Sequence, residues 1–153
     1  MATATMTKTA GLSLPAVKQK TRLKVTIFHC FNSLMNTEFL DESGYEVESI
    51  KLPCSSLNRE VVLLRAFEAG ADAVMVLACP LGACHYIQGN LRAAKRVARV
   101  QKLLDEIGLD GRRLSFFNIP AHDSEAVTDL VARTLDGLQE IGPLHQRQEI
   151  SLR

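Results

Sequence analysis

The chain has 153 residues and a mass of 16.9 kDa, which suits one domain with a sizeable hydrophobic core. Its formal net charge of +1 gives no case for a nucleic-acid or membrane partner, and no apolar run approaches the roughly 20 residues that span a bilayer. An aromatic content of 5% without Trp also argues against a base-stacking platform for single strands. We expect a cytoplasmic protein that binds no nucleic acid and is not inserted in a membrane.

The N-terminal 1–21 segment carries bases without an acid and shows no hydrophobic periodicity. It lacks an apolar core long enough for a secretory signal, and it is interpreted as a flexible basic tail. A first strand is predicted over Leu23–His29. A short helix is predicted over 31–41, ending before Ser43 and Gly44.

Two strands and a helix are predicted next. Tyr45–Leu52 alternates apolar and polar residues, which indicates a half-exposed edge strand ended by Pro53. A helix over Asn58–Ala69 precedes Gly70, the residue type favoured in a left-handed position after a helix. The inward face of this helix is predicted to contain Val61, Leu64 and either Ala66 or Phe67. The fully apolar Ala73–Ala78 run indicates a central strand covered on both faces.

A loop and a long helix follow the central strand. Proline and glycine break the Cys79–Gly89 segment, and Asn90 is predicted to cap a helix that runs to Ile107. The inward side of this helix is predicted to comprise Ala93, Val97, Val100, Leu104 and Ile107. The opposite side is basic and comprises Arg92, Lys95, Arg96, Arg99 and Lys102.

A last strand and a last helix complete the predicted order. The strand covers Leu114–Asn118, and Asp123 or Ser124 caps a helix that extends to about Ile141. Residues 146–153 are expected to be frayed. Alternating strands and helices imply right-handed crossovers and a small, doubly wound, mostly parallel sheet of about four strands, flavodoxin-like or Rossmann-like. We expect a single α/β domain over 22–145.

Four cysteines are the most informative residues of the chain. Cys30, Cys54 and Cys79 each come at or just after the end of a predicted strand, and Cys84 lies in the loop after Cys79. The carboxyl ends of parallel strands share one edge, so we expect the four side chains to meet there. Grouped cysteines in a cytosolic protein indicate a metal ion or an iron–sulfur cluster. Because no Cys-x2-Cys pair is present, this prediction rests on topology, and burial as a small hydrophobe is the competing interpretation.

Other polar residues are candidates for supporting roles. His85 follows Cys84 and is a candidate ligand or hydrogen-bond partner of a sulfur, whereas His29 should point away from Cys30, because neighbours on a strand alternate. The positive N-terminus of the long helix should face the cysteine loop. Arg92 and Arg96 are therefore candidates for a docking surface or for a counter-charge to a negative cluster.

Three segments resemble the delta subunit of methyl-viologen-reducing hydrogenase: Cys54–Ser56, Ala66–Val74 and, above all, Cys79–Asn90, which reads Cys-x4-Cys-His-Tyr-x-x-Gly-Asn. The resemblance implies a [2Fe-2S] cluster and an electron-transfer role. It implies a heterodisulfide-reductase-like flavoprotein partner and other subunits of an oxidoreductase complex, with no catalytic residue in this chain. Related modules also accompany reductases of aromatic acyl thioesters and of methylene-tetrahydrofolate, so the host complex stays open.

One position departs from the family pattern. The family usually has a second cysteine after its first strand, where this chain has Ser33. The resemblance then implies that Cys30, Cys54, Cys79 and Cys84 all hold the cluster; alternatively, the cluster is lost, or Ser33 or His85 serves as a ligand.

Three other functions are open on the sequence alone. The four sulfurs would also suit a structural zinc site. Cys79 and Cys84 would suit a thiol-disulfide protein if one thiol had a depressed pKa. A metal-free, flavodoxin-like scaffold that bridges larger subunits is the third alternative.

Overall fold

The computed structural model describes residues 22–34 and 45–144. The strands are β1 (Lys24–Cys30), β2 (Glu46–Leu52), β3 (Ala73–Ala78) and β4 (Leu114–Asn118). The α-helices are α1 (Glu60–Glu68), α2 (Gly89–Glu106) and α3 (Ser124–Ile141), and short 3₁₀ turns, η2 and η3, cover Ser55–Leu57 and Gly111–Arg113. The predicted tail over 1–21 and the predicted frayed end over 146–153 lie outside the described residues.

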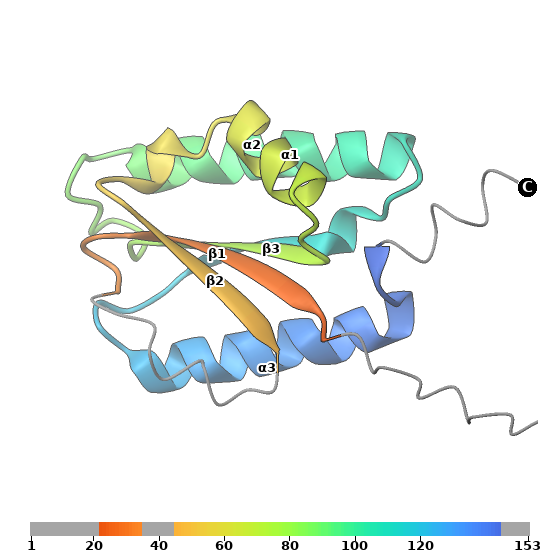
Figure 1. Ribbon diagram of the computed structural model, residues 1–153. Coiled ribbons are helices and arrows are strands. Elements are labelled where there is room, and N and C mark those ends of the chain that lie inside the picture. The colour runs from red at the N-terminus through yellow and green to blue at the C-terminus, as the bar shows by residue number, and fades with distance from the viewer. Residues whose placement is uncertain (1–21, 35–44, 145–153) are drawn as a thin grey trace, which may run out of the picture.

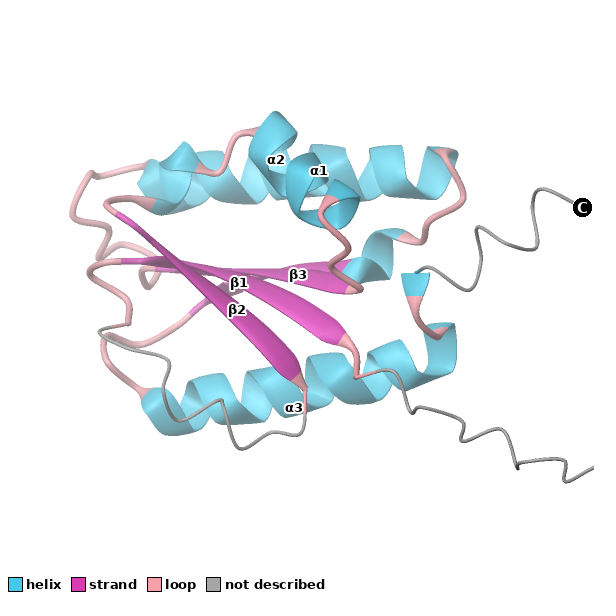
Figure 2. Cartoon of the chain, in the orientation of Figure 1, coloured by secondary structure: helices cyan, strands magenta, loops and turns pink. Residues whose placement is uncertain are grey.

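The four strands form one parallel sheet in the order β2-β1-β3-β4 (Figure 1). This confirms the predicted α/β class with a parallel sheet. The central strand β3 is buried along its whole length, and the edge strand β2 contains only exposed and half-buried residues, both as predicted. All strands run in one direction, so their carboxyl ends and the loops that follow them share one edge of the sheet (Figure 2). We call it the carboxyl edge.

Helices cover both faces of the sheet. The first core lies under α1 and α2 and contains Phe28, Val74 and Val76 of the sheet with Leu63, Phe67, Val97, Val100 and Leu104 of the helices. The second lies under α3 and contains Val25, Ile27, Met75 and Leu77 of the sheet with Val127, Val131, Leu135 and Leu138. The two sets of β1 residues alternate along the strand, as the period of two requires. Burying each of these side chains contributes about 1.5–3 kcal/mol. No helix among the described residues has the length and apolar character to cross a bilayer.

The inward face predicted for the first helix was right at Phe67 and wrong at Val61 and Leu64, which corresponds to a small rotation of the helix. Leu63 and Phe67 are buried, whereas Val61 is 48% exposed and Leu64 only half-buried. Residues 61–64 are all apolar, so the periodicity fits two orientations of the helix. The contact with β3 and α2 selects the one that buries positions four residues apart.

Two details of α2 also differ from the prediction. Asn90 lies inside the helix rather than at its cap, a position taken by Gln88. Ile107 is 63% exposed, because the helix ends at Glu106 and the chain turns away through Gly108, whose φ is +77°. Its place in the core is taken by Leu109, which packs against the α1 and α2 side of the sheet.

The remaining boundaries were predicted well, apart from the 31–41 helix. Asp123 caps α3 by accepting a hydrogen bond from the Ala126 N–H at 2.9 Å, as predicted. The described part of the 31–41 segment is a turn, in which the amides of Ser33 and Leu34 donate to the Cys30 carbonyl. The rest of that predicted helix lies outside the described residues.

One buried carboxylate fixes the amino edge of the sheet. Asp72 is 4% exposed and accepts hydrogen bonds from the Lys24 amide at 2.8 Å and from the Leu144 amide at 2.7 Å. The fully buried Arg113 guanidinium donates to the carbonyls of Asp72 and Gly142. These contacts join the start of β1 to the segment after α3, at the end of the sheet opposite the carboxyl edge.

Candidate functional site

The four cysteines lie together at the carboxyl edge, as the topology predicts. Cys30 is the last residue of β1, and Cys79 follows the neighbouring strand β3. Their Sγ atoms are 3.5 Å apart, and both residues are almost fully buried. Cys30 lies on the α1 and α2 side of the sheet, because it alternates with the buried Phe28 of that core.

The other two sulfurs meet at Gly89, the first residue of α2. A methyl group built on Gly89 would lie 2.4 Å from the Cys54 Sγ atom and 3.2 Å from the Cys84 Sγ atom. Both sulfurs therefore lie against the bare Cα of this glycine. Cys84 also contacts Cys79 through its side chain, which joins the two pairs into one group of four.

Backbone and side-chain donors surround these sulfurs. Cys84 accepts hydrogen bonds from the amides of Tyr86, Gly89 and Asn90, and Cys79 accepts one from the amide of His85. The Cys54 Sγ atom accepts from Ser56, at 3.4 Å from the amide and 3.2 Å from the hydroxyl. The amides of His85 and Tyr86 in the loop, and those of the first two residues of α2, thus point toward the sulfurs.

Two asparagines hold this cysteine loop in place. The Asn90 side-chain amide donates to the carbonyls of Cys79 and Pro80 at 3.2 and 3.0 Å. Asn118, the last residue of β4, donates to the same Cys79 carbonyl at 2.6 Å. The start of the loop is therefore fixed from α2 and from β4. Sequence reasoning assigned Asn90 to a helix cap and did not identify Asn118, although its place at the end of a parallel strand was a usable signal.

The sulfurs differ in how readily they ionise. Burial, followed by the neighbouring Cys30 side chain, raises the pKa of the Cys79 thiol to about 12. Burial also opposes ionisation of Cys84, but the amides of Asn90, Tyr86 and Gly89 outweigh it and lower the pKa of that thiol. A cation bound between the sulfurs would offset both the burial and the neighbouring thiolates that raise the pKa of Cys79.

This difference predicts selective alkylation of the metal-free chain. Because the thiolate is the nucleophile, iodoacetamide at pH 8 should label the part-exposed Cys84 at least roughly tenfold faster than the buried Cys79. Peptide mass spectrometry after short labelling times measures both rates in one sample. Equal labelling of the two cysteines in folded protein would show that the amides do not stabilise the Cys84 thiolate.

The other predicted site residues have separate positions. Ser33 is buried, and its hydroxyl donates to the Cys30 carbonyl at 2.8 Å. The His85 side chain is exposed and contacts the Tyr86 ring edge-on at 5.1 Å, so the link of His85 to the sulfurs is through its backbone amide. His29 is buried on the α3 side of the sheet, away from Cys30, and burial lowers its pKa.

The two candidate arginines of α2 also differ. Arg92 is exposed on the first turns of the helix. The Arg96 guanidinium donates to the Ser56 carbonyl, in the turn that carries Cys54, and lies 4.0 Å from Glu60. Arg96 therefore joins α2 to the Cys54 turn.

The arrangement of the sulfurs differs from that around a single metal ion. Across residues 22–34 and 45–144, no three or more His, Cys, Asp or Glu side chains surround one point as a single ion requires. The sulfurs of Cys30 and Cys79 are adjacent, Cys84 contacts Cys79, and the sulfurs of Cys54 and Cys84 both lie against Gly89. Four grouped thiols with N–H donors directed at them have the ligand chemistry of an iron–sulfur site.

This chain is similar in sequence to one family of hydrogenase subunits. The methyl-viologen-reducing hydrogenase delta subunit family matches residues 29–142. The vhu iron-sulfur subunit of the F420-non-reducing hydrogenase of Methanocaldococcus jannaschii is 37% identical over 97 residues, which cover 63% of this chain and 72% of that protein. The iron-sulfur subunit of the Archaeoglobus profundus F420-non-reducing hydrogenase is 30% identical over 97 residues, 63% of this chain and 71% of that protein.

A second type of relative is much longer. It is a subunit of the ferredoxin:CoB-CoM heterodisulfide reductase of Methanosarcina mazei, and it is 36% identical over 98 residues. The match covers 64% of this chain but only 12% of that protein. A segment similar to this chain is thus a small part of a larger reductase subunit.

Proposed function

We propose, because this chain belongs to the methyl-viologen-reducing hydrogenase delta subunit family, that it is an electron-transfer subunit of a hydrogenase or heterodisulfide reductase complex. The observation that carries the proposal is the group of four cysteine sulfurs, drawn from three strand ends and one loop, at a single edge of the sheet. Loops at this edge of a parallel sheet are where such folds bind their ligands.

The residues proposed to hold a [2Fe-2S] cluster are Cys30, Cys54, Cys79 and Cys84. Such a cluster takes four thiolates and, when bound, accepts and releases one electron at a time. The four sulfurs supply this ligand set. A structural zinc ion needs all four ligands around one point, and among the described residues no three such side chains surround one. Gly89 supports the same assignment, since its missing side chain leaves room for the sulfurs of Cys54 and Cys84.

The chain's own hydrogen-bond donors would set the reduction potential of the proposed cluster. The amides of His85, Tyr86, Gly89 and Asn90 and both donors of Ser56 stabilise negative charge on the sulfurs. The N-terminus of α2 adds partial positive charge at the same place. These contacts favour the reduced, more negative form of a cluster, so the site should have a higher reduction potential than one without them.

The proposed partner is a heterodisulfide-reductase-like protein that carries flavin and further iron–sulfur clusters. The names of the relatives support it, since they include hydrogenase subunits and a subunit of a heterodisulfide reductase. This chain would then relay electrons to or from that partner, without a substrate site of its own. We further propose that residues 22–145 fold as one iron–sulfur domain in the cytoplasm.

Anaerobic purification tests the proposal directly. The chain should retain about two iron atoms and two acid-labile sulfides and give an EPR signal on reduction with dithionite. Colourless protein with bound zinc would identify a structural zinc module instead. Protein that holds neither metal nor sulfide after anaerobic reconstitution would refute the electron-transfer role. Replacement of Cys79 in that protein would then show whether Cys79 and Cys84 have thiol-disulfide activity.

A further inference from the structure

Exposed apolar side chains gather around the cysteines. We call the rim the four residues Phe31, Leu81, Tyr86 and Ile87, which are 52%, 69%, 56% and 84% exposed. Phe31 directly follows Cys30, Leu81 lies between Cys79 and Cys84, and Tyr86 and Ile87 follow Cys84. In the part of the chain that the structure describes, the four most exposed large apolar residues other than Ile107 are these four. Apolar exposure concentrated at one place indicates an interaction site.

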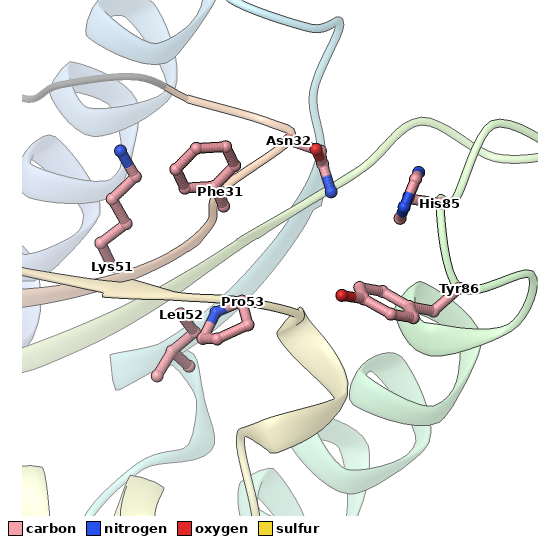
Figure 3. Close-up of a pocket in the computed structure, with 7 residues that line it drawn as sticks. All are labelled: Phe31, Asn32, Lys51, Leu52, Pro53, His85 and Tyr86. Atoms are coloured by element: carbon pink, nitrogen blue, oxygen red, sulfur yellow. The ribbon is translucent and has the colours of Figure 1, made fainter.

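A pocket opens beside the rim. It has a volume of about 500 Å³ and is lined by Phe31, Asn32, Lys51, Leu52, Pro53, His85 and Tyr86. Figure 3 shows the Phe31 ring across the pocket from His85 and Tyr86, with Leu52 and Pro53 below. The Lys51 ammonium lies 4.3 Å from the centre of the Phe31 ring and places a positive charge at the pocket. The pocket is large enough for a partner's side chain. Its lining includes Phe31, Pro53 and His85, the sequence neighbours of Cys30, Cys54 and Cys84.

Ile87 has an unfavourable position in the isolated chain. Its φ is +63°, a left-handed conformation that is rare for a β-branched residue. The turn that imposes this φ also directs the neighbouring amides at Cys84. These hydrogen bonds to the sulfur account for the backbone conformation. Nothing in the part of the chain that the structure describes accounts for the exposure of the isoleucine side chain. Burial against a second protein would account for it.

The charge next to the rim is positive. From Gly89 to Leu104, α2 carries five bases and no acid, and the first acid of the helix is Asp105. Arg96 and Arg99 contact Glu60, while Arg92, Lys95 and Lys102 are exposed on the helix. The cysteine loop itself, from Cys79 to Gln88, has no Lys, Arg, Asp or Glu. A partner that covers the rim therefore meets a basic surface beside it, and charge complementarity requires that partner to be acidic there.

We infer that the rim, its pocket and the basic side of α2 form one docking surface for a redox protein with an acidic face. One apolar side chain of that protein fills the pocket, and its carboxylates face the α2 bases. The surface adjoins the sulfurs, so a docked cofactor comes close enough for electron exchange. That the occupant is a heterodisulfide-reductase-type protein rests on the proposed function; the surface itself rests on the exposure, the pocket and the charge.

Binding measurements with matched variants test this inference. The probe is the same organism's homologue of the longer heterodisulfide reductase relative, purified separately and bound to this chain at several NaCl concentrations by biolayer interferometry under anaerobic conditions. Ile87→Ser should weaken binding roughly tenfold, as expected for a side chain central to an interface. Lys95→Glu should slow association and flatten its dependence on salt. Ile107→Ser, at a 63% exposed residue just after the end of α2, and Arg133→Glu, on α3, should bind like the unmodified chain.

Iron content and visible absorbance of each variant separate docking from cluster loss. Cluster-bearing Ile87→Ser and Lys95→Glu proteins that bind as tightly as the unmodified chain would overturn the docking surface and leave the electron-transfer proposal intact. A probe that does not bind the unmodified chain would also overturn it. Weakened binding by variants of a chain that holds no cluster would support the surface and refute the proposed cofactor.

Discussion

Replacing Gly89 with alanine should reduce the iron retained by the chain by roughly tenfold to a hundredfold. The added methyl carbon would lie 2.4 Å from the Cys54 sulfur and 3.2 Å from the Cys84 sulfur, so at least Cys54 must move. Overpacking of this kind costs about 1–3 kcal/mol, and each 1.4 kcal/mol corresponds to about a factor of ten in binding. Iron and sulfide analysis after anaerobic reconstitution, together with visible absorbance, measures the loss.

Gly137→Ala is the matched control for this variant. Gly137 is also a helical glycine, in α3, and a methyl group on it meets nothing within 4 Å. This substitution should leave iron content unchanged and stabilise the fold by about 0.5–1 kcal/mol, because alanine loses less backbone entropy in a helix. A Gly89→Ala protein that folds and loads iron as well as the control would show that the sulfurs of Cys54 and Cys84 do not hold the cofactor together.

Replacing Cys30 in one variant and Ser33 in another should have opposite effects on cluster retention. Cys30→Ser removes a proposed ligand and should lower cluster retention by more than the roughly 10–100-fold that loss of an outer partner costs. Ser33→Ala should keep the cluster, because the Ser33 hydroxyl is already hydrogen-bonded to the Cys30 carbonyl at 2.8 Å. The Cys30 carbonyl also accepts from the amides of Ser33 and Leu34, so this loss should cost only about 1 kcal/mol of folding stability.

EPR spectra and urea unfolding of the two variants are the measurements that decide between the ligand sets. If Ser33→Ala kept its stability yet lost or changed the EPR signal, the serine would be a ligand in place of the family's extra cysteine. A Cys30→Ser protein with an unchanged spectrum would point the same way. The two variants thus resolve whether Cys30, at the end of β1, or Ser33, in the turn after it, supports the cluster.

The fold was predictable because strand signals are strong in this chain. The bounds of β3 and β4 agree with the prediction, since the apolar run Ala73–Ala78 and the Leu114–Asn118 segment have clear limits. The orientation of α1 was not predictable, because apolar residues occupy more of its surface than the core can cover. The burial of Ile107 could not be predicted, because it depends on the residue at which α2 ends. Tertiary packing determines that residue, and the local sequence does not.

For the site, topology was informative and local detail was not. Parallel strands bring Cys30, Cys54 and Cys79 to one edge whatever the loops do, so their meeting followed from the element order. The contact of Gly89 with two sulfurs depends on the path of the loop between Cys84 and α2. From the sequence, Gly89 could be interpreted only as a residue that interrupts regular structure. The same holds for the role of Asn90, since an asparagine at the start of a helix is more often a cap than a clamp on a distant carbonyl.

The Asp72 contacts also determine how this domain can be joined to other polypeptides. Through Lys24 and Leu144, that carboxylate brings the start of β1 and the segment after α3 together at one end of the sheet (Figure 1). The sulfurs lie at the opposite end, the carboxyl edge. Affinity tags or neighbouring modules attached beyond either point can be tethered there with the carboxyl edge and its cysteines left uncovered. Such an arrangement suits insertion of the same unit into a longer polypeptide, like the reductase subunit of which a similar segment makes up 12%.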